Sequence, residues 1–138
     1  MPARDRYHDA VRNALMKDGW TITHDPYTLS YGPRDVYVDL GAERVIGAER
    51  GLERIAVEIK TFRGPSEIRE FESAIGQYVF YRVLLGQVDS DRKLYLAVPD
   101  TVLNTLFEEP IARPVLDALA LSVLGYDPQQ EVITAWKP

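Results

Sequence analysis

The spacing of apolar positions along the chain predicts helices where the period is three to four residues and strands where it is two. Near the N-terminus, Tyr7, Val11 and Leu15 share one helical face, and Gly19 is suited to end that helix. Over the whole chain the pattern predicts the order α-β-β-β-α-β-α-β-β. The expected helices cover residues 3–20, 67–87 and about 101–119 (interrupted at Pro110 and Pro114), and the expected strands cover 21–32, 35–49, 54–62, 92–99, 121–127 and 131–138.

Two of these boundaries carry clear local signals. Gly32 and Pro33 predict a turn between the first two strands, since both residue types favour turn geometry. Ser66 follows a Gly-Pro pair and is suited to cap the helix over 67–87. That helix begins amphipathic and becomes apolar on nearly all sides, which predicts that its second half is buried.

Length and composition favour a single domain over residues 1–138, of the mixed α/β class with a mixed central sheet and flanking helices. The chain contains no cysteine, which excludes disulfides, a thiol nucleophile and cysteine-ligated zinc or iron–sulfur sites. No apolar run approaches the length of a membrane span, and no apolar segment follows the N-terminus. We therefore expect a cytoplasmic protein that does not enter a membrane.

The net charge bears on any interaction with nucleic acid. The formal charge is −5 at pH 7, whereas proteins that bind nucleic acid by neutralising phosphates are usually basic. A role on DNA therefore requires a local basic surface, a metal ion or a partner.

A carboxylate and an amine interrupt the most apolar of the expected strands, "RIAVEIKTF" over 54–62. Glu58 and Lys60 point to one face of this strand, while Val57 and Ile59 point to the other. A buried carboxylate is costly unless it is paired or bound to a metal. The chain has only four lysines against twelve arginines. A lysine at position 60 is therefore unusual in a chain whose basic residues are mostly arginines. A structural ion pair and a functional site are both consistent with this pattern, and we favour the site.

Asp39 is the nearest carboxylate that could join this pair. If the strands over 35–49 and 54–62 form a hairpin, Asp39 approaches Glu58 and Lys60 across the ladder. Two carboxylates at one end of a sheet suit a hard divalent cation such as Mg²⁺. Asp35 shares a face with Asp39 and is an alternative ligand, but it lies beside the Gly-Pro turn, where Asp is common for turn reasons.

The helix that follows carries two further candidate residues. Gln77 and Tyr81 are four positions apart and lie on one helical face. That face points away from the apolar stripe containing Ile68, Ile75 and Val79. We expect Gln77 and Tyr81 to reach the site formed by the two strands.

These residues together resemble a known pattern. Asp39, then Glu58-x-Lys60 on the next strand, then Gln77-x-x-x-Tyr81 on the next helix, resembles the PD-(D/E)XK nuclease superfamily. Within it, the segments "YHDAVRNALMKDGWTITHDPYTL", "DVYVDLGAE", "IAVEIKTFRGPSEI", "AIGQYVFYR", "YLAVP" and "GYDPQQEVITAW" closely resemble the XisH family. Members of that family are described as controlling factors for excision of the fdxN element, a DNA segment removed by site-specific recombination. The resemblance implies a restriction-endonuclease-like fold and a role in DNA rearrangement.

The resemblance also implies roles for individual residues. Asp39 and Glu58 correspond to ligands of Mg²⁺ or Mn²⁺, Lys60 to the residue that assists the attacking water, and Gln77 with Tyr81 to supporting residues. Asp9 is the nearest match to an acidic residue that the superfamily often has on its first helix, where Glu is usual. Val38 stands where the superfamily usually has proline.

Two functions remain open from the sequence. One is a metal-dependent endonuclease acting on DNA during excision. The other is a catalytically silent nuclease-fold subunit that binds a companion excision protein, XisI. The resemblance implies DNA, XisI and a site-specific recombinase as partners. It also makes a homodimer one of the assemblies to expect, because nuclease-fold proteins that cut duplexes commonly act as dimers.

Overall fold

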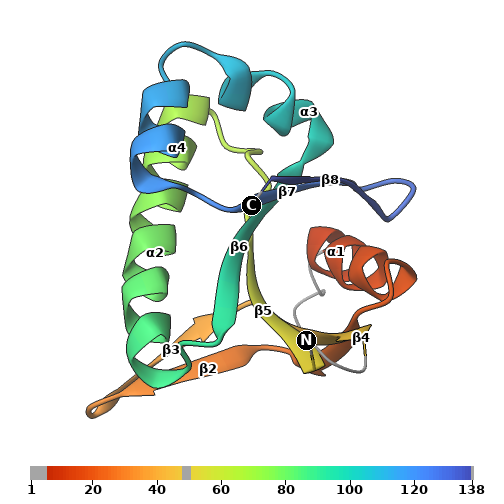
Figure 1. The fold of residues 1–138 in the computed structure, drawn as a ribbon. Helices are drawn as coiled ribbons and strands as arrows, with labels where there is room; N and C mark the ends of the chain where they lie inside the picture. The colour runs from red at the N-terminus through yellow and green to blue at the C-terminus, as the bar shows by residue number, and fades with distance from the viewer. Residues whose placement is uncertain (1–5, 48–50, 138) are drawn as a thin grey trace.

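The computed structural model describes residues 6–47 and 51–137, and its centre is one curved six-stranded sheet (Figure 1). Its strands lie in the order β1-β4-β5-β6-β7-β8, with β5, β6 and β7 parallel and the other neighbours antiparallel. The elements are α1 (Arg6–Lys17), β1 (Thr21–His24), β2 (Tyr27–Tyr31), β3 (Arg34–Val38), β4 (Leu40–Gly47), β5 (Gly51–Ile59), α2 (Glu67–Val88), β6 (Arg92–Pro99), α3 (Asp100–Leu103), the 3₁₀ helix η1 (Leu106–Glu108), α4 (Arg113–Leu119), β7 (Val123–Asp127) and β8 (Val132–Lys137).

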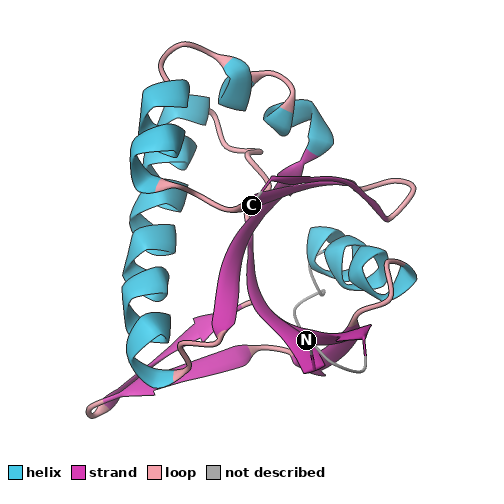
Figure 2. Cartoon of the chain, in the orientation of Figure 1, coloured by secondary structure: helices cyan, strands magenta, loops and turns pink. Residues whose placement is uncertain are grey.

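The helices cover the two faces of this sheet unequally. Helix α1 lies in the concave side of the sheet, whereas α2 and α4 cover the outer side (Figure 2). Strands β2 and β3 form a separate two-stranded hairpin, which extends below the C-terminal end of α2. The arrangement confirms the predicted mixed α/β class with a mixed central sheet and flanking helices. No helix in the described residues is long and apolar enough to cross a membrane.

Two of the predicted strands are each divided in the structure. The strand expected over 21–32 breaks at Asp25 and Pro26, and the strand expected over 35–49 breaks at Asp39. Proline has no N–H to donate to a strand ladder, which ends the pairing of β1 with β4. Beyond these breaks, β2 pairs with β3, and this separates the hairpin from the main sheet.

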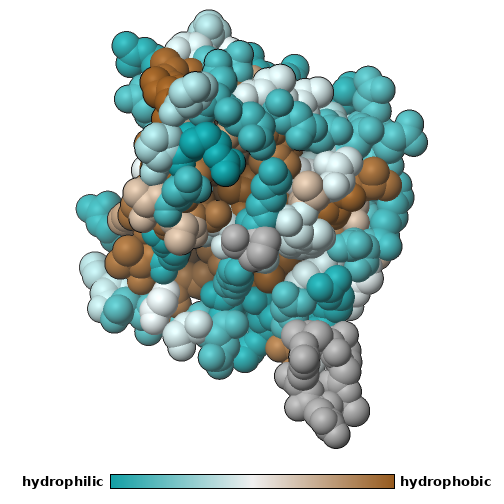
Figure 3. Space-filling view, turned by 45° about the horizontal axis from the view of Figure 1, so that its top comes forward, coloured by the Kyte–Doolittle hydropathy of each residue, from teal (hydrophilic) through white to brown (hydrophobic). Residues whose placement is uncertain are grey.

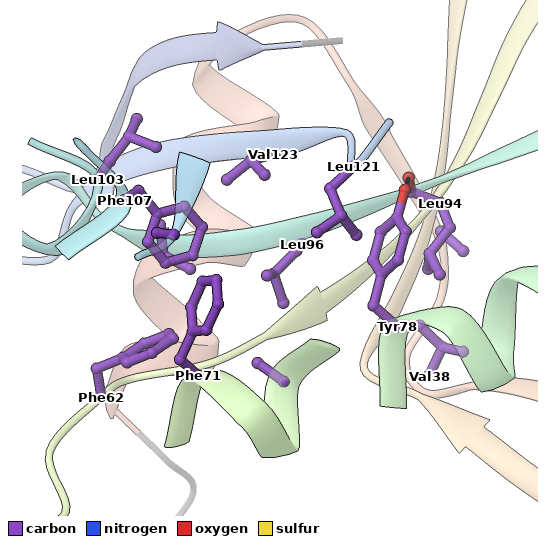
Figure 4. Close-up of a cluster of buried hydrophobic side chains, with 14 of the residues drawn as sticks. Val38, Phe62, Phe71, Tyr78, Leu94, Leu96, Leu103, Phe107, Leu121 and Val123 are labelled. Atoms are coloured by element: carbon purple, nitrogen blue, oxygen red, sulfur yellow. Dashed lines mark hydrogen bonds between the residues drawn. The ribbon is translucent and has the colours of Figure 1, made fainter. Parts of the chain in front are cut away.

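Two apolar clusters, one on each face of the sheet, form the core. On the α1 side, Val11 and Leu15 pack with Val57 of β5, while Ala56 belongs to the cluster on the α2 side. The rings of Phe62, Phe71 and Phe107 meet edge to face in the α2-side cluster (Figure 4). The alternation along β5 therefore supplies side chains to both clusters, as expected for a central strand.

Helix α2 begins as predicted, but its second half is buried on one side only. The Ser66 side chain accepts a hydrogen bond from the backbone N–H of Arg69, at 3.3 Å, and so caps the helix. Phe80 and Val83 are 53% and 59% exposed, because only one side of the helix faces the sheet and α4. The prediction of burial was therefore wrong. Apolar residues also reach the surface on the face seen in Figure 3.

The third helical region is interrupted at Pro110 as expected, but not at Pro114. The region divides into α3, η1 and α4, and Pro114 lies in the first turn of α4 rather than breaking a helix. Proline is tolerated there because the N–H groups of a first turn have no helical acceptor.

Tyr78 connects α2 to two strands through one buried hydroxyl. It donates to the carbonyl of Leu94 at 3.0 Å and accepts from the N–H of Ser122 at 3.1 Å. We expect Tyr78→Phe to lower the free energy of unfolding by about 1–3 kcal/mol, because both backbone groups lose a buried partner. Urea unfolding measures this change, with Tyr31→Phe as a control at an exposed tyrosine. Equal losses in the two variants would contradict the prediction.

Candidate functional site

Asp39 is the residue at which the chain passes from the hairpin into the central sheet. It lies between β3 and β4, and its neighbour Leu40 pairs with Val57 of β5. This register brings Asp39 level with Glu58. The Asp39 carboxylate accepts a hydrogen bond from the N–H of Ile59 at 2.8 Å, and the Asp39 N–H donates to Oε1 of Glu58 at 3.4 Å. The predicted approach of Asp39 to the end of β5 is confirmed.

Glu58 and Lys60 lie on the same side of the strand end, as the alternation predicts. Glu58 is only 6% exposed, whereas the Lys60 side chain is 26% exposed. The Lys60 ammonium lies 3.5 Å from Oε2 of Glu58. The N–H of Lys60 donates to the carbonyl of Ala97 at 2.9 Å, which extends the pairing of β5 with β6 by one bond. Lys60 is therefore held by its backbone while its amine has access to solvent.

The surroundings of Glu58 disfavour its charged form. Burial is the largest effect and the nearby carboxylate of Asp39 the next, and together they raise the pKa of Glu58 to about 8. The positive charge of Lys60 acts in the opposite direction but does not cancel them. A carboxyl in this state gains strongly from a cation that neutralises both acids, which is the condition for a metal ligand.

Helix α2 places Tyr81 and Gln77 on the same face of the sheet as Glu58. The pKa of Tyr81 is raised by burial first, and then by the negative charges of Glu58 and Asp39. The side-chain oxygen of Gln77 is buried and has no hydrogen-bond partner among the described residues. An unpartnered carbonyl oxygen of this kind is suited to a ligand or an ordered water.

The two other acidic candidates lie elsewhere. Asp35 is exposed on β3, where its carboxylate accepts a hydrogen bond from Ser30 Oγ at 2.7 Å, so the structure favours Asp39 over Asp35 as the site residue. Asp9 lies on α1, which packs on the opposite face of the sheet from Glu58. Residues 6–47 and 51–137 contain no group of three or more His, Asp or Glu side chains placed to hold a metal. The role of Asp9 stays a prediction.

The donors that are present fit a divalent cation with open water positions. The neighbouring carboxylates of Asp39 and Glu58 are hard oxygen ligands of the kind that Mg²⁺ and Mn²⁺ prefer. The contacts that join Asp39 to β5 are made by backbone amides. No residue type marks such contacts, so the sequence pattern could not reveal them.

The raised pKa of Glu58 predicts a pH-dependent stability for the metal-free protein. Because the folded state holds this proton more tightly than the unfolded chain, the stability contributed by Glu58 is full below about pH 4.5 and is lost as the pH rises through about 8. Glu58→Gln removes this titration. The variant should therefore gain stability relative to wild type as the pH rises, by at most about 1.4 kcal/mol per pH unit.

Urea unfolding in a chelator between pH 5 and pH 9 measures this difference. Glu72→Gln is the control, since Glu72 is exposed on α2. If the free energy of unfolding of Glu58→Gln changed with pH in parallel with that of the wild type across this range, the prediction would be contradicted.

Comparison with known proteins gives the chain a family. The family model described as XisH protein matches residues 1–134. A crystal structure of an XisH family protein from Nostoc punctiforme PCC 73102 is 41% identical with a TM-score of 0.88, covering 97% of this chain and 100% of that one. A crystal structure of an fdxN element excision controlling factor protein from Anabaena variabilis is 42% identical with a TM-score of 0.88, covering 98% of this chain and 100% of that one. No curated protein matches the chain. The protein belongs to the XisH family.

Proposed function

We propose that this protein controls the excision of a genomic DNA element and does so with a metal-dependent site for phosphodiester hydrolysis. Its similarity to an fdxN element excision controlling factor supports the first part. One observation carries the second part: Asp39, Glu58 and Lys60 converge at the end of β5. This grouping matches the PD-(D/E)XK nucleases that the sequence resembles.

Each residue has a role that follows from its position. Asp39 and Glu58 would hold Mg²⁺ or Mn²⁺, which would supply Lewis-acid polarisation of a phosphoryl oxygen and acidify a water. Lys60, with its half-exposed amine beside Glu58, orients the attacking water and stabilises negative charge that develops on the phosphate. The buried oxygen of Gln77 and the hydroxyl of Tyr81 position these groups from α2.

Substitution of Asp39 and of Lys60 separates metal binding from chemistry. We expect Asp39→Ala to abolish Mn²⁺ binding and DNA cleavage, because it removes a ligand. Lys60→Ala should keep Mn²⁺ binding and lower the cleavage rate by about 10²-fold or more, because it removes only transition-state stabilisation. Calorimetric titration with Mn²⁺ and cleavage of supercoiled, nicked and branched DNA measure the two effects.

Asp35→Ala is a matched control for Asp39→Ala. It removes a carboxylate four residues away that lies on the hairpin and bonds to Ser30. Mn²⁺ binding and cleavage should be unchanged in this variant. Wild-type protein that is folded but binds no Mn²⁺ and cuts none of these DNAs would overturn the catalytic proposal.

A second candidate function is that of a regulatory subunit that binds XisI. One face of α2 favours it, since Phe80 and Val83 are exposed and a side chain added at Gly76 on the same face would meet open space. Glycine costs about 1 kcal/mol in a helix relative to alanine, and no packing within the chain requires it here. An exposed apolar helix face of this kind is typical of protein interfaces.

This candidate predicts a different pattern of mutational effects. Phe80→Ser combined with Val83→Ser should abolish co-purification with XisI, because it replaces the apolar contact surface. Lys60→Ala should leave the complex intact, since Lys60 lies at the end of β5 and not on this face. Leu52→Ser is a control at another exposed apolar residue, on β5. A complex that survives the double substitution would exclude this face as the binding surface.

A further inference from the structure

Two arginines from distant parts of the chain lie against one tyrosine ring. The guanidinium carbon of Arg63 lies 5.2 Å from the centre of the Tyr7 ring, and that of Arg6 lies 5.8 Å from it. Both arginine side chains are exposed. The aromatic ring attracts each cation by its quadrupole and so holds two like charges near one another.

This cluster lies at the same edge of the sheet as the candidate site. The Tyr7 ring contacts the ring of Tyr126 in β7, with 6.4 Å between centres, and Tyr126 pairs with Pro99 at the end of β6. Lys60 bonds to Ala97 of the same strand. Because β5, β6 and β7 are parallel, their C-terminal ends meet at one edge, and this edge carries Lys60 on one face and the two arginines on the other.

The backbone directs Arg63 toward this position. Phe62 has a φ of 56°, a left-handed conformation that is rare for a bulky residue. Its ring is buried and packs against Phe107 on the α2 side of the sheet, at 5.8 Å between centres. The chain thus crosses the edge of the sheet between Phe62 and Arg63, and the strained conformation persists because the Phe62 ring is fixed on one side.

Neither arginine has a carboxylate partner in the part of the chain that the structure describes. Other arginines do: Arg12 lies 2.5 Å from a carboxylate oxygen of Asp25, and Arg92 lies 2.9 Å from one of Asp89. Arg6 and Arg63 make only the contacts with the Tyr7 ring among those described. In a chain with a net charge of −5, two unpaired guanidinium groups at the site edge form a local basic surface.

We propose that Arg6 and Arg63 bind backbone phosphates of the DNA that flank the bond presented to Asp39, Glu58 and Lys60. Guanidinium groups donate paired N–H bonds to phosphate oxygens, and a phosphate chain placed over the edge neutralises both charges. The Tyr7 ring positions the two arginines before DNA arrives. This inference rests on the proposed function, since it assumes that the substrate is DNA.

The test is binding of a short fluorescent DNA duplex in a chelator, where no metal-dependent cleavage can occur. Anisotropy titrations at several NaCl concentrations should show that Arg6→Ala combined with Arg63→Ala binds at least about tenfold more weakly than wild type. The slope of log K against log salt should fall by about 1.8, because each phosphate contact contributes about 0.9.

Arg69→Ala combined with Arg113→Ala is the matched control. It removes the same charge from two exposed arginines on α2 and α4 that make no ion pair among those described. Affinity within twofold of wild type in this control, with the loss confined to the Arg6 and Arg63 variant, supports the proposal. Equal losses in both variants, no loss in either, or no binding by wild type would overturn it. DNA binding that depends on Arg6 and Arg63, together with no cleavage when Mn²⁺ is supplied, would overturn the catalytic proposal alone.

Discussion

The hydrogen bond from the N–H of Ile59 to the carboxylate of Asp39 connects the hairpin, the central sheet and the candidate site. At Asp39 the chain leaves the β2–β3 hairpin and enters β4, so a side chain there can satisfy an amide at the end of β5. The same bond brings the Asp39 carboxylate beside that of Glu58. One local contact therefore sets both the point where two sheets separate and the distance between two acids.

That proximity has an electrostatic cost, which bears on the proposed metal site. If Glu58 and Lys60 were only an ion pair, the amine would dominate the environment of the carboxyl and lower its pKa. Instead, burial and Asp39 outweigh Lys60, and the pKa is raised to about 8. Two carboxylates facing one half-exposed amine leave negative charge uncompensated when both are ionised. Under the proposed function a divalent cation would correct this imbalance, since the described contacts of these acids include no amine other than that of Lys60.

The sequence predicted the site better than it predicted the surrounding surface. The two-residue period placed Glu58 and Lys60 on one face, and the hairpin expectation brought Asp39 to them. The helical angle of Tyr81 directs it to the face of the sheet that carries Glu58, and the charges of both acids raise its pKa after burial. These inferences depend on local geometry, which the sequence specifies.

The predicted burial of Phe80 and Val83 was wrong, because an apolar helix pattern does not reveal which faces meet a neighbouring element. The break at Asp39 also depends on a backbone contact that no residue type marks.

The edge of the sheet separates the buried acid Glu58 from the exposed Arg63. Glu58 is buried on the α2 side, whereas Arg63 is exposed on the α1 side, and the chain between them crosses the edge at Phe62. Because an acidic chain repels DNA at long range, the proposed function requires a few unpaired cations near the site. If the arginines were on the same face as the acids, they would form ion pairs with those carboxylates. They would then not be available to bind a phosphate. Their placement across the edge keeps both sets available, and the left-handed conformation of Phe62 is what makes that placement geometrically possible.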